Sequence, residues 1–360
     1  MPESRCVLQI GLMNAASLQM PDTKTNRILI VSPSWVGDCM LMQPMLMRLK
    51  QRHPDCIIDV LAPPWTAALL RAMPEVYGVI INPFPHGVLH LAARYRLGKR
   101  LRDARYCQAI VLPNSWKSAL VPFFAGIPLR TGFIGEARHI LLNDKRKLDK
   151  TALPLMVERF ALLAEDAHDG VSHPVANPKL EISEEQRKAA INKLGLTLDK
   201  PVAAFCPGAE YGPAKRWPAD YYANIAQRLQ QHGYAVWLIG SGKDKEVANE
   251  INQLAGGWCN NLCGSTDLGD AIALIASARL VISNDSGLMH LAAALDLPLI
   301  ALFGSSSPQF TPPLSGQAQI VRLDIECSPC FKRECQFGHF NCMKQLTPDL
   351  VWSRLAPIVK

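Results

Sequence analysis

The chain alternates short apolar, β-branched runs with longer amphipathic stretches from residue 27 to its end. The short runs have the composition of buried strands and the stretches between them have helical periodicity, so the alternation predicts βαβ units on parallel sheets. The expected fold class is therefore α/β. The expected strands are 27–32, 57–62, 78–82, 108–112, 202–206, 234–239, 280–283 and 299–303, and the expected helices are 38–52, 89–104, 115–125, 154–165 and 348–359, with four more starting near 218, 243, 268 and 286.

The length of 360 residues predicts two domains, because single hydrophobic cores stop growing well below that length. Periodicity is lost at 166–178, where Gly, Pro, Asn and His accumulate as they do in linkers. Ligands bind outside the carboxyl ends of parallel strands, so the substrate site is expected in a central cleft that two Rossmann-like domains face. The expected division is an N-terminal extension at 1–25, an acceptor domain at 26–170, a linker at 171–185, a nucleotide-sugar domain at 186–346 and a terminal helix at 347–360.

Composition narrows the class of protein. Apolar residues make up 49% of the chain and charged residues 19%, which is typical of a globular protein. The net charge of +7 suits anionic ligands, and the basic cluster between Arg94 and Arg105 is either a solvated helix face or a contact for phosphate, an acidic sugar or a membrane surface. No apolar stretch is long enough to span a membrane, and the cysteines, mostly scattered through apolar segments, indicate a reduced, cytoplasmic protein.

The strongest local motif follows the expected strand 280–283, where Asn-Asp-Ser-Gly precedes a helix rich in small residues. Asp285 or Ser286 can cap that helix, Gly287 lets a ligand approach the backbone, and the helix amides favour a diphosphate. His290, one turn later, can add a hydrogen-bond donor to a phosphate oxygen or a ribose hydroxyl. The alternative is an ordinary capped helix with His290 as a core residue.

Two more loops follow strands of the same expected sheet. The first carries Gly208 and then Lys215, which can neutralise charge on a departing diphosphate in a sequence that has no Asp-rich metal-binding signature. The alternative for Lys215 is a solvated surface cation. The second loop carries Gly240 and Ser241, whose backbone amides offer a weaker phosphate site.

Asp38 follows the first expected strand and stands at the start of a helix. A carboxylate in that place can accept the proton of an attacking hydroxyl, which is the role that an inverting sugar transfer requires. Local features alone favour a simpler interpretation, in which Asp38 caps its own helix.

Four segments of the chain form a recognisable set, in the order SWVGDCMLMQP, LPNSWKSALVPFFAGIPLRTGF, CPGAEYGPAKRWP and NDSGLMHLAAALDLPLIALFG. With these segments, the chain resembles the lipopolysaccharide inner-core heptosyltransferases of glycosyltransferase family 9, and most closely their heptosyltransferase II group. The match runs from about residue 27 to the C-terminus.

The resemblance implies a GT-B fold and a metal-independent inverting transfer of L-glycero-D-manno-heptose from ADP-heptose to the first heptose of the Kdo-lipid A core. It assigns the catalytic carboxylate to Asp38 and the phosphate-binding lysine to Lys215. It also implies peripheral contact with the inner face of the inner membrane, and we expect a monomer with no cofactor and no nucleic-acid partner. The family's motif for binding the sugar donor falls on Asp285, Ser286, Gly287 and His290.

The acceptor implied by the resemblance is an anionic glycolipid, so we expect basic residues of the chain to bind it. The candidates for binding its phosphate or carboxylate groups are Arg94, Arg100, Arg130 and Arg138.

The chain departs from the heptosyltransferase II pattern in four clustered cysteines near its end. Four thiols at such spacing could hold a structural zinc ion, but reduced or paired cysteines in a C-terminal loop are the favoured interpretation, so no metal is expected. These residues are Cys327, Cys330, Cys335 and Cys342.

Three rival functions stay open at this point. A sister transferase would share the nucleotide-sugar site and differ only in its acceptor loops. A non-catalytic protein that binds nucleotide or lipid core would need no Asp38. An oxidoreductase is disfavoured because the dinucleotide fingerprint around Gly240 is incomplete.

Overall fold

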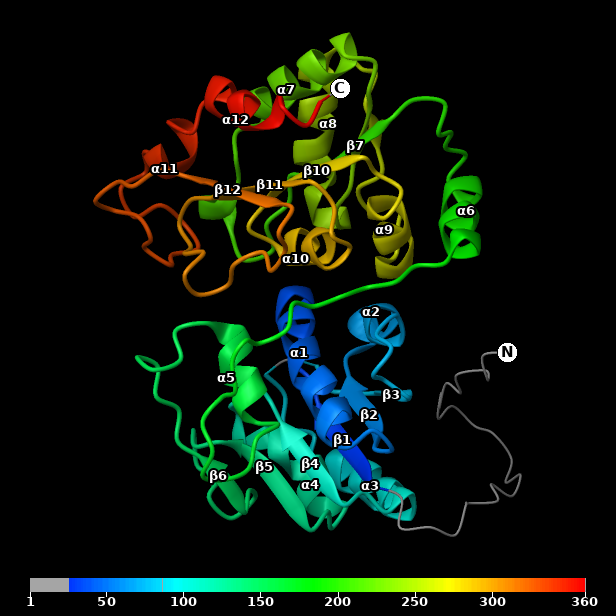
Figure 1. Ribbon diagram of the computed structural model, residues 1–360, viewed down its shortest axis with the longest axis vertical. Coiled ribbons are helices and arrows are strands. Elements are labelled where there is room, and N and C mark those ends of the chain that lie inside the picture. The colour runs from blue at the N-terminus through cyan, green and yellow to red at the C-terminus, as the bar shows by residue number, and fades with distance from the viewer. Residues whose placement is uncertain (1–25, 86, 360) are drawn as a thin grey trace. The chain divides into compact units, whose positions relative to one another are not determined.

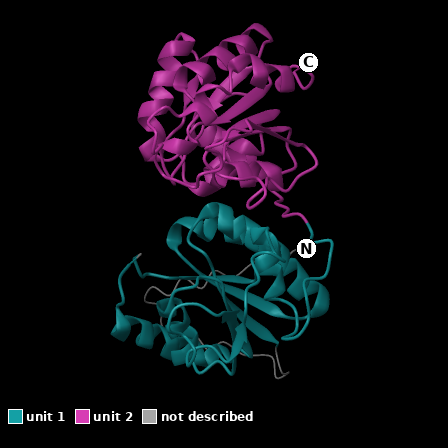
Figure 2. Cartoon of the chain, turned by 90° about the vertical axis from the view of Figure 1, so that its left-hand side faces the viewer, with its two compact units in different colours: residues 1–176 teal, residues 177–360 magenta. Residues whose placement is uncertain are grey.

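The computed structural model describes residues 26–85 and 87–359, and the chain divides into two compact units between Ala176 and Asn177 (Figure 2). The dividing point falls inside the segment 171–185 that the sequence marks as a linker. The predicted N-terminal extension at 1–25 lies outside the described residues. No helix in the described ranges combines the length and the apolar character that crossing a membrane requires.

The first unit is built on a six-stranded sheet in which every neighbouring pair of strands is parallel (Figure 1). The strand order is β3-β2-β1-β4-β5-β6, so the winding reverses between β1 and β4. Ligands of open parallel sheets bind at this kind of reversal. The strands are β1 (Arg27–Val31), β2 (Ile57–Ala62), β3 (Gly78–Ile81), β4 (Gln108–Val111), β5 (Leu129–Phe133) and β6 (Asp144–Arg146).

Helices cover both faces of this sheet. On one face, Leu29 and Val31 of β1 share a core with Leu97 of α3 and Val121 of α4. On the other, α1 packs against α5. The helices are α1 (Val36–Arg52), α2 (Ala67–Arg71), α3 (Leu91–Leu101), α4 (Leu120–Phe124) and α5 (Met156–Leu162), with short 3₁₀ turns at Pro64–Thr66, Arg102–Ala104 and Trp116–Ala119.

The second unit repeats the same winding. Its sheet has the order β12-β11-β10-β7-β8-β9, again parallel throughout, and reverses between β7 and β10. The strands are β7 (Val202–Cys206), β8 (Ala235–Leu238), β9 (Asn260–Asn261), β10 (Leu280–Asn284), β11 (Leu299–Phe303) and β12 (Ala318–Arg322).

Alternate residues of each central strand in this unit feed two separate cores. Phe205 of β7 packs with Tyr222 of α7 on one face, whereas Cys206 packs with the layer that holds Met289 of α10 on the other. A strand buried on both faces reads as a continuous apolar run, which is why β7 and β10 are visible in the sequence. The helices are α6 (Glu184–Lys193), α7 (Ala219–Gln231), α8 (Lys245–Ala255), α9 (Leu268–Ile275), α10 (Gly287–Ala294), α11 (Asn341–Lys344) and α12 (Pro348–Leu355), with 3₁₀ turns at Pro213–Lys215 and Gly242–Asp244.

Candidate functional site

The loop after β7 and the turn after β10 meet at the winding reversal of the second unit. Lys215 Nζ lies 2.6 Å from Asp285 Oδ2, and the two side chains are 17% and 5% exposed. An ion pair at the carboxyl edge of a parallel sheet stands where ligands of this fold class bind. The structure therefore brings together two residues that the sequence predicts for the same site.

Asn284, the last residue of β10, ties three segments of this site together. Its side chain is fully buried. Oδ1 accepts hydrogen bonds from the Trp217 backbone N–H and the Tyr222 hydroxyl, both at 3.1 Å, and Nδ2 donates to the Pro207 carbonyl at 2.7 Å. The single loop from Pro207 to Trp217 is thereby fixed to β10 at both of its ends, and Lys215 lies between these two fixed points.

Replacing Asn284 by alanine is expected to lower the free energy of unfolding by about 3 kcal/mol, because the buried Tyr222 hydroxyl, Trp217 N–H and Pro207 carbonyl lose their partner. Urea unfolding of the variant measures this loss. Asn192→Ala, at an exposed position on α6, is the matched control and should change stability by less than about 0.5 kcal/mol. Equal stability of the two variants would contradict the anchoring role.

His290 lies in the first turn and a half of α10 and is buried. Burial, opposed by the Asp285 charge and assisted by the Lys215 charge, lowers the pKa of its imidazole to about 4. The side chain is therefore neutral near pH 7. It can offer a ring N–H to a ligand but cannot serve there as a cationic proton donor.

The depressed pKa of His290 predicts how stability changes with pH. The unfolded chain binds the proton with a pKa near 6.5 and the folded chain only near 4, so stability is retained above about 6.5 and falls as the pH drops between these values. The His290 contribution amounts to about 3 kcal/mol at full protonation. Urea unfolding at pH 7 and pH 4.5 measures this loss of stability. His290→Asn should not show the part of the loss that His290 causes, whereas His53→Asn, at an exposed position, should show the same loss as the parent protein.

The helix α10 begins at an amide-rich turn. Ser286 occupies the N-cap position with extended backbone angles but makes no capping hydrogen bond, and its hydroxyl lies 3.3 Å from Ser283 Oγ. Gly287 is the first helical residue. Helix N-termini without a side-chain cap present amide donors, and these match the oxygens of a phosphate.

Asp244 connects the two glycine-containing turns. A Cβ atom on Gly208 would lie 2.4–2.5 Å from the Asp244 carboxyl group, and one on Gly240 would lie 3.0 Å from Asp244 Cβ. The carboxylate accepts hydrogen bonds from the Ser241 N–H and hydroxyl and lies 3.8 Å from Arg216. Gly208 and Gly240 thus provide room for a buried carboxylate that orders both turns.

Asp38 lies in the first turn of α1 and is half-buried. This helix follows β1, one of the two strands between which the winding of the first sheet reverses. Trp35 occupies the N-cap position and Asp38 is the third helical residue, where a carboxylate also interacts favourably with the helix amides, so the assignment of Asp38 as the catalytic base stays a prediction. Its neighbour Cys39 is fully buried, and burial, followed by the Asp38 charge, raises the pKa of the Cys39 thiol. Asp38 is the acidic group of this turn, and Cys39 stays neutral beside it.

Two of the four predicted acceptor arginines are buried and bind backbone carbonyls. Arg94 is 7% exposed, donates to the carbonyls of Val88, Leu89 and Lys117, and stacks over the Phe84 ring. Arg138 is 1% exposed and donates to the carbonyls of Phe133 and Pro113. These two guanidinium groups fix the loops after β3, β4 and β5, so we revise their assignment from ligand contact to loop positioning.

The other two arginines lie elsewhere on the first unit. Arg130, near the amino end of β5, donates to the carbonyls of Leu141 and Ile127 and lies over the Phe123 ring. Since the sheet is parallel, that end is opposite to the edge that carries Asp38. Arg100 is exposed near the end of α3.

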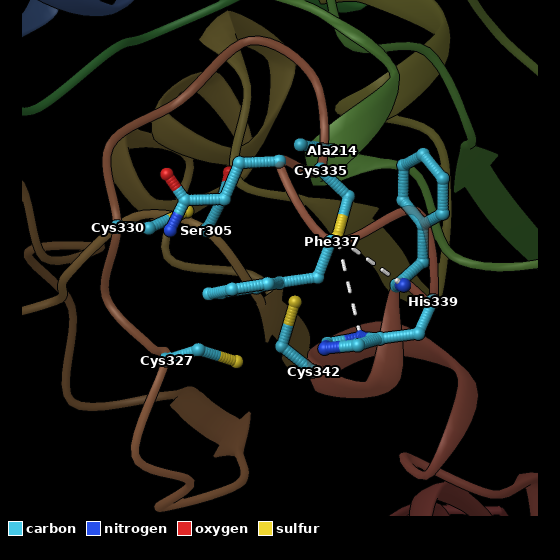
Figure 3. Close-up of a pocket in the computed structure, with 10 residues that line it drawn as sticks. Ala214, Ser305, Cys327, Cys330, Cys335, Phe337, His339 and Cys342 are labelled. Atoms are coloured by element: carbon cyan, nitrogen blue, oxygen red, sulfur yellow. Dashed lines mark hydrogen bonds between the residues drawn. The ribbon is translucent and has the colours of Figure 1, made fainter.

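The four clustered cysteines are free thiols, each partly exposed, and line one small cavity of the second unit (Figure 3). They lie in the segment between β12 and α12, next to the Lys215 loop. No three metal-ligating side chains in residues 26–85 and 87–359 already stand at separations that would hold an ion.

Sequence reasoning missed Asn284, Asp244 and Tyr211. Asp244 had a signal, because Ser241 and Asp244 have the spacing of a capping box. Asn284 stands inside the quoted motif, but its partners are more than sixty residues away and cannot be read locally. Tyr211 had no signal: its ring lies 5.2 Å from Lys215 Nζ and 5.3 Å from the Arg333 guanidinium.

Comparison with known proteins decides the family. A sequence model of glycosyltransferase family 9 (heptosyltransferase) matches residues 94–341. The chain is 49% identical to lipopolysaccharide heptosyltransferase 2 of Escherichia coli K12, over 91% of this chain and 97% of that protein. The chain belongs to glycosyltransferase family 9, the heptosyltransferases.

Two more relatives support membership in family 9. Lipooligosaccharide heptosyltransferase 2 of Haemophilus influenzae is 46% identical over 91% of this chain and 98% of that protein. The solved structure of E. coli ADP-heptose LPS heptosyltransferase II superimposes with a TM-score of 0.84 at 46% identity and covers 92% of this chain and 98% of that one. The predicted GT-B fold of two Rossmann-like domains and the predicted glycosyltransferase class are confirmed.

Proposed function

We propose that this heptosyltransferase transfers L-glycero-D-manno-heptose from ADP-heptose to the first heptose of the Kdo-lipid A core, with inversion and without a metal ion. The observation that carries the proposal is the Lys215–Asp285 pair at the winding reversal of the second unit, beside the N-terminus of α10. The amides of Ser286 and Gly287, together with Lys215, match the charge of a diphosphate. The names of the relatives supply the choice of sugar and nucleotide.

In the proposed reaction, the oxygen of the acceptor hydroxyl attacks the anomeric carbon of heptose while the Asp38 carboxylate removes the hydroxyl proton. The bond from that carbon to the ADP oxygen breaks, and ADP leaves with the electron pair. Lys215 and the α10 amides stabilise the negative charge that grows on the diphosphate. Neutral His290 and the turns at Gly208, Gly240 and Ser241 position the nucleotide sugar.

An acceptor panel tests the proposed substrate. Purified protein is incubated with ADP-heptose and Kdo-lipid A carrying no heptose, one heptose or two heptoses, and products are identified by mass spectrometry. Product on the one-heptose acceptor alone supports the proposal. Product on the heptose-free acceptor would reassign the chain to a sister activity, and transfer to none of them with intact ADP binding would favour a non-catalytic binding protein.

The surface around α3 suits the membrane contact that this acceptor requires. Leu91 and Tyr95, one helical turn apart, are 49% and 45% exposed, and the basic side chains of Arg96, Lys99 and Arg100 stand beside them. Exposed apolar side chains flanked by cations bind the interface of anionic bilayers. We propose that this face contacts the inner membrane at its cytoplasmic side and that the enzyme acts as a monomer there.

The double variant Leu91→Glu/Tyr95→Glu is expected to lose about tenfold in affinity for vesicles of phosphatidylcholine and phosphatidylglycerol, measured by co-sedimentation. Leu254→Glu, at a 47% exposed position on α8, is the control and should bind as the parent does. Unchanged binding of the double variant would remove α3 from the contact but would leave the transfer reaction untouched.

A further inference from the structure

The clustered cysteines surround a cavity that the transfer reaction does not use. The cavity has a volume of about 20 Å³ and is lined by all four thiols, with His339 and Ser305 also contributing. Figure 3 shows the sulfur atoms of Cys327, Cys335 and Cys342 turned into this space from different sides. A space of this volume holds one water molecule or one ion.

Two features of the lining suit a thiolate and a bound cation. The Phe340 backbone N–H donates to Cys335 Sγ at 3.4 Å, which favours a negatively charged sulfur. Ser305 is 2% exposed, and its buried hydroxyl oxygen has no hydrogen-bond partner among the described residues. A buried hydroxyl left without a partner points to a group that is missing from the cavity.

The segment that carries the thiols has little regular structure of its own. Residues 323–340 contain neither helix nor strand, and the side chains from Phe331 to Glu334 are exposed, so a hydrophobic core does not hold this stretch. Long irregular segments in compact domains are often held by a bound ion or serve a function. Two, four and six residues separate the successive cysteines, so all four can reach a common centre.

The same segment supports the loop that presents Lys215. The Ala214 N–H donates to the Arg333 carbonyl at 3.0 Å, and the Tyr211 hydroxyl donates to the Phe331 carbonyl at 2.8 Å. Gly212 packs so closely against Arg333 that a Cβ atom there would lie 2.4 Å from the Arg333 carbonyl oxygen. Whatever orders residues 327–342 therefore also orders the backbone around Lys215.

We propose that a single thiophilic metal cation, of the zinc or ferrous class, binds the thiolates of Cys327, Cys330, Cys335 and Cys342 and fixes this segment against the Lys215 loop. No three of these ligands within the described chain stand at binding separation, so the sulfurs rotate inward to close around the ion. Four thiolates give the tetrahedral set of a structural site, with no open position for substrate. The cation has a structural role and takes no part in the transfer step.

Metal content tests the site without measuring sugar transfer. Protein purified under reducing conditions without chelator, and chelator-stripped protein re-incubated with Zn²⁺, are analysed by plasma mass spectrometry for zinc and iron. We expect about one equivalent per chain in the refilled protein and in Cys107→Ser, whose cysteine belongs to the first unit, and almost none in Cys335→Ser/Cys342→Ser. Less than a tenth of an equivalent in the refilled parent protein, or equal content in the double variant, would overturn the site.

Two readouts guard against a double variant that fails to fold. In the parent protein, Zn²⁺ should protect the four clustered cysteines from iodoacetamide but leave Cys107 as reactive as before, as peptide mass spectrometry reports. Trypsin should cut at exposed Lys332 and Arg333 about tenfold faster in stripped protein than in refilled protein. Disulfides among these cysteines in freshly isolated protein, or equal cutting rates, would contradict a metal-held segment.

Discussion

Replacing Asp38 by asparagine is expected to lower kcat about a thousandfold, because the amide cannot accept the proton of the acceptor hydroxyl. The affinity for ADP should stay within about twofold, since the nucleotide is proposed to bind to residues of the second unit. Asp38 lies in the first turn of α1, so loss of its charge should cost at most about 1 kcal/mol of stability. Initial rates with ADP-heptose and ADP binding by calorimetry measure the two effects.

A matched control separates chemistry from charge in this test. Asp103 is an exposed carboxylate of the same unit, and Asp103→Asn should keep the parental kcat. A variant Asp38→Glu keeps the charge but moves the carboxylate by one methylene, and it should retain part of the rate. Parental turnover in Asp38→Asn would refute the assignment of the base, while a large change in ADP affinity would indicate that Asp38 acts through structure.

Strands with long apolar runs were predictable from the sequence, including β3 at a sheet edge, whereas short or half-exposed strands were not. β7 and β10 are buried on both faces, so each appears as an unbroken apolar run. β6 has the sequence Asp-Lys-Arg and is ordered by pairing with β5 and by the Arg146–Asp144 ion pair, which leave no apolar signal. β5, β9 and β12 also went unpredicted, together with α2 and α6, because short or half-exposed elements depend on neighbours that only the fold supplies.

The location of the candidate site was predictable for a topological reason. In a parallel sheet all strands end at one edge, so polar loops after successive strands must converge, as Lys215 and Asp285 do. Buried arginines escape this logic. Arg94 and Arg138 look in the sequence like any cation for an acidic substrate, yet their guanidinium groups are satisfied by carbonyls of loops distant in sequence. Only the folded chain distinguishes a cation that binds a ligand from one that holds a loop.

Replacing Lys215 by alanine is expected to weaken ADP binding about tenfold and to lower kcat about a hundredfold, because the diphosphate loses its cation both on binding and on departure. The change also leaves the Asp285 carboxylate without its cation, which lies 2.6 Å away in the parent protein. Because Asp285 is only 5% exposed, the free energy of unfolding should fall by about 1–3 kcal/mol. Lys243→Ala, which removes an exposed lysine paired with Glu210, is the control and should alter neither property.

The double variant Lys215→Ala/Asp285→Asn separates the two losses. Neutralising Asp285 removes the unpaired buried charge, so the double variant should regain most of the stability that Lys215→Ala loses. It should not regain turnover, because no cation is restored at the diphosphate. Recovery of kcat along with stability would mean that Lys215 serves only to neutralise Asp285, and the charge on the departing ADP would then have to be stabilised by the α10 amides alone.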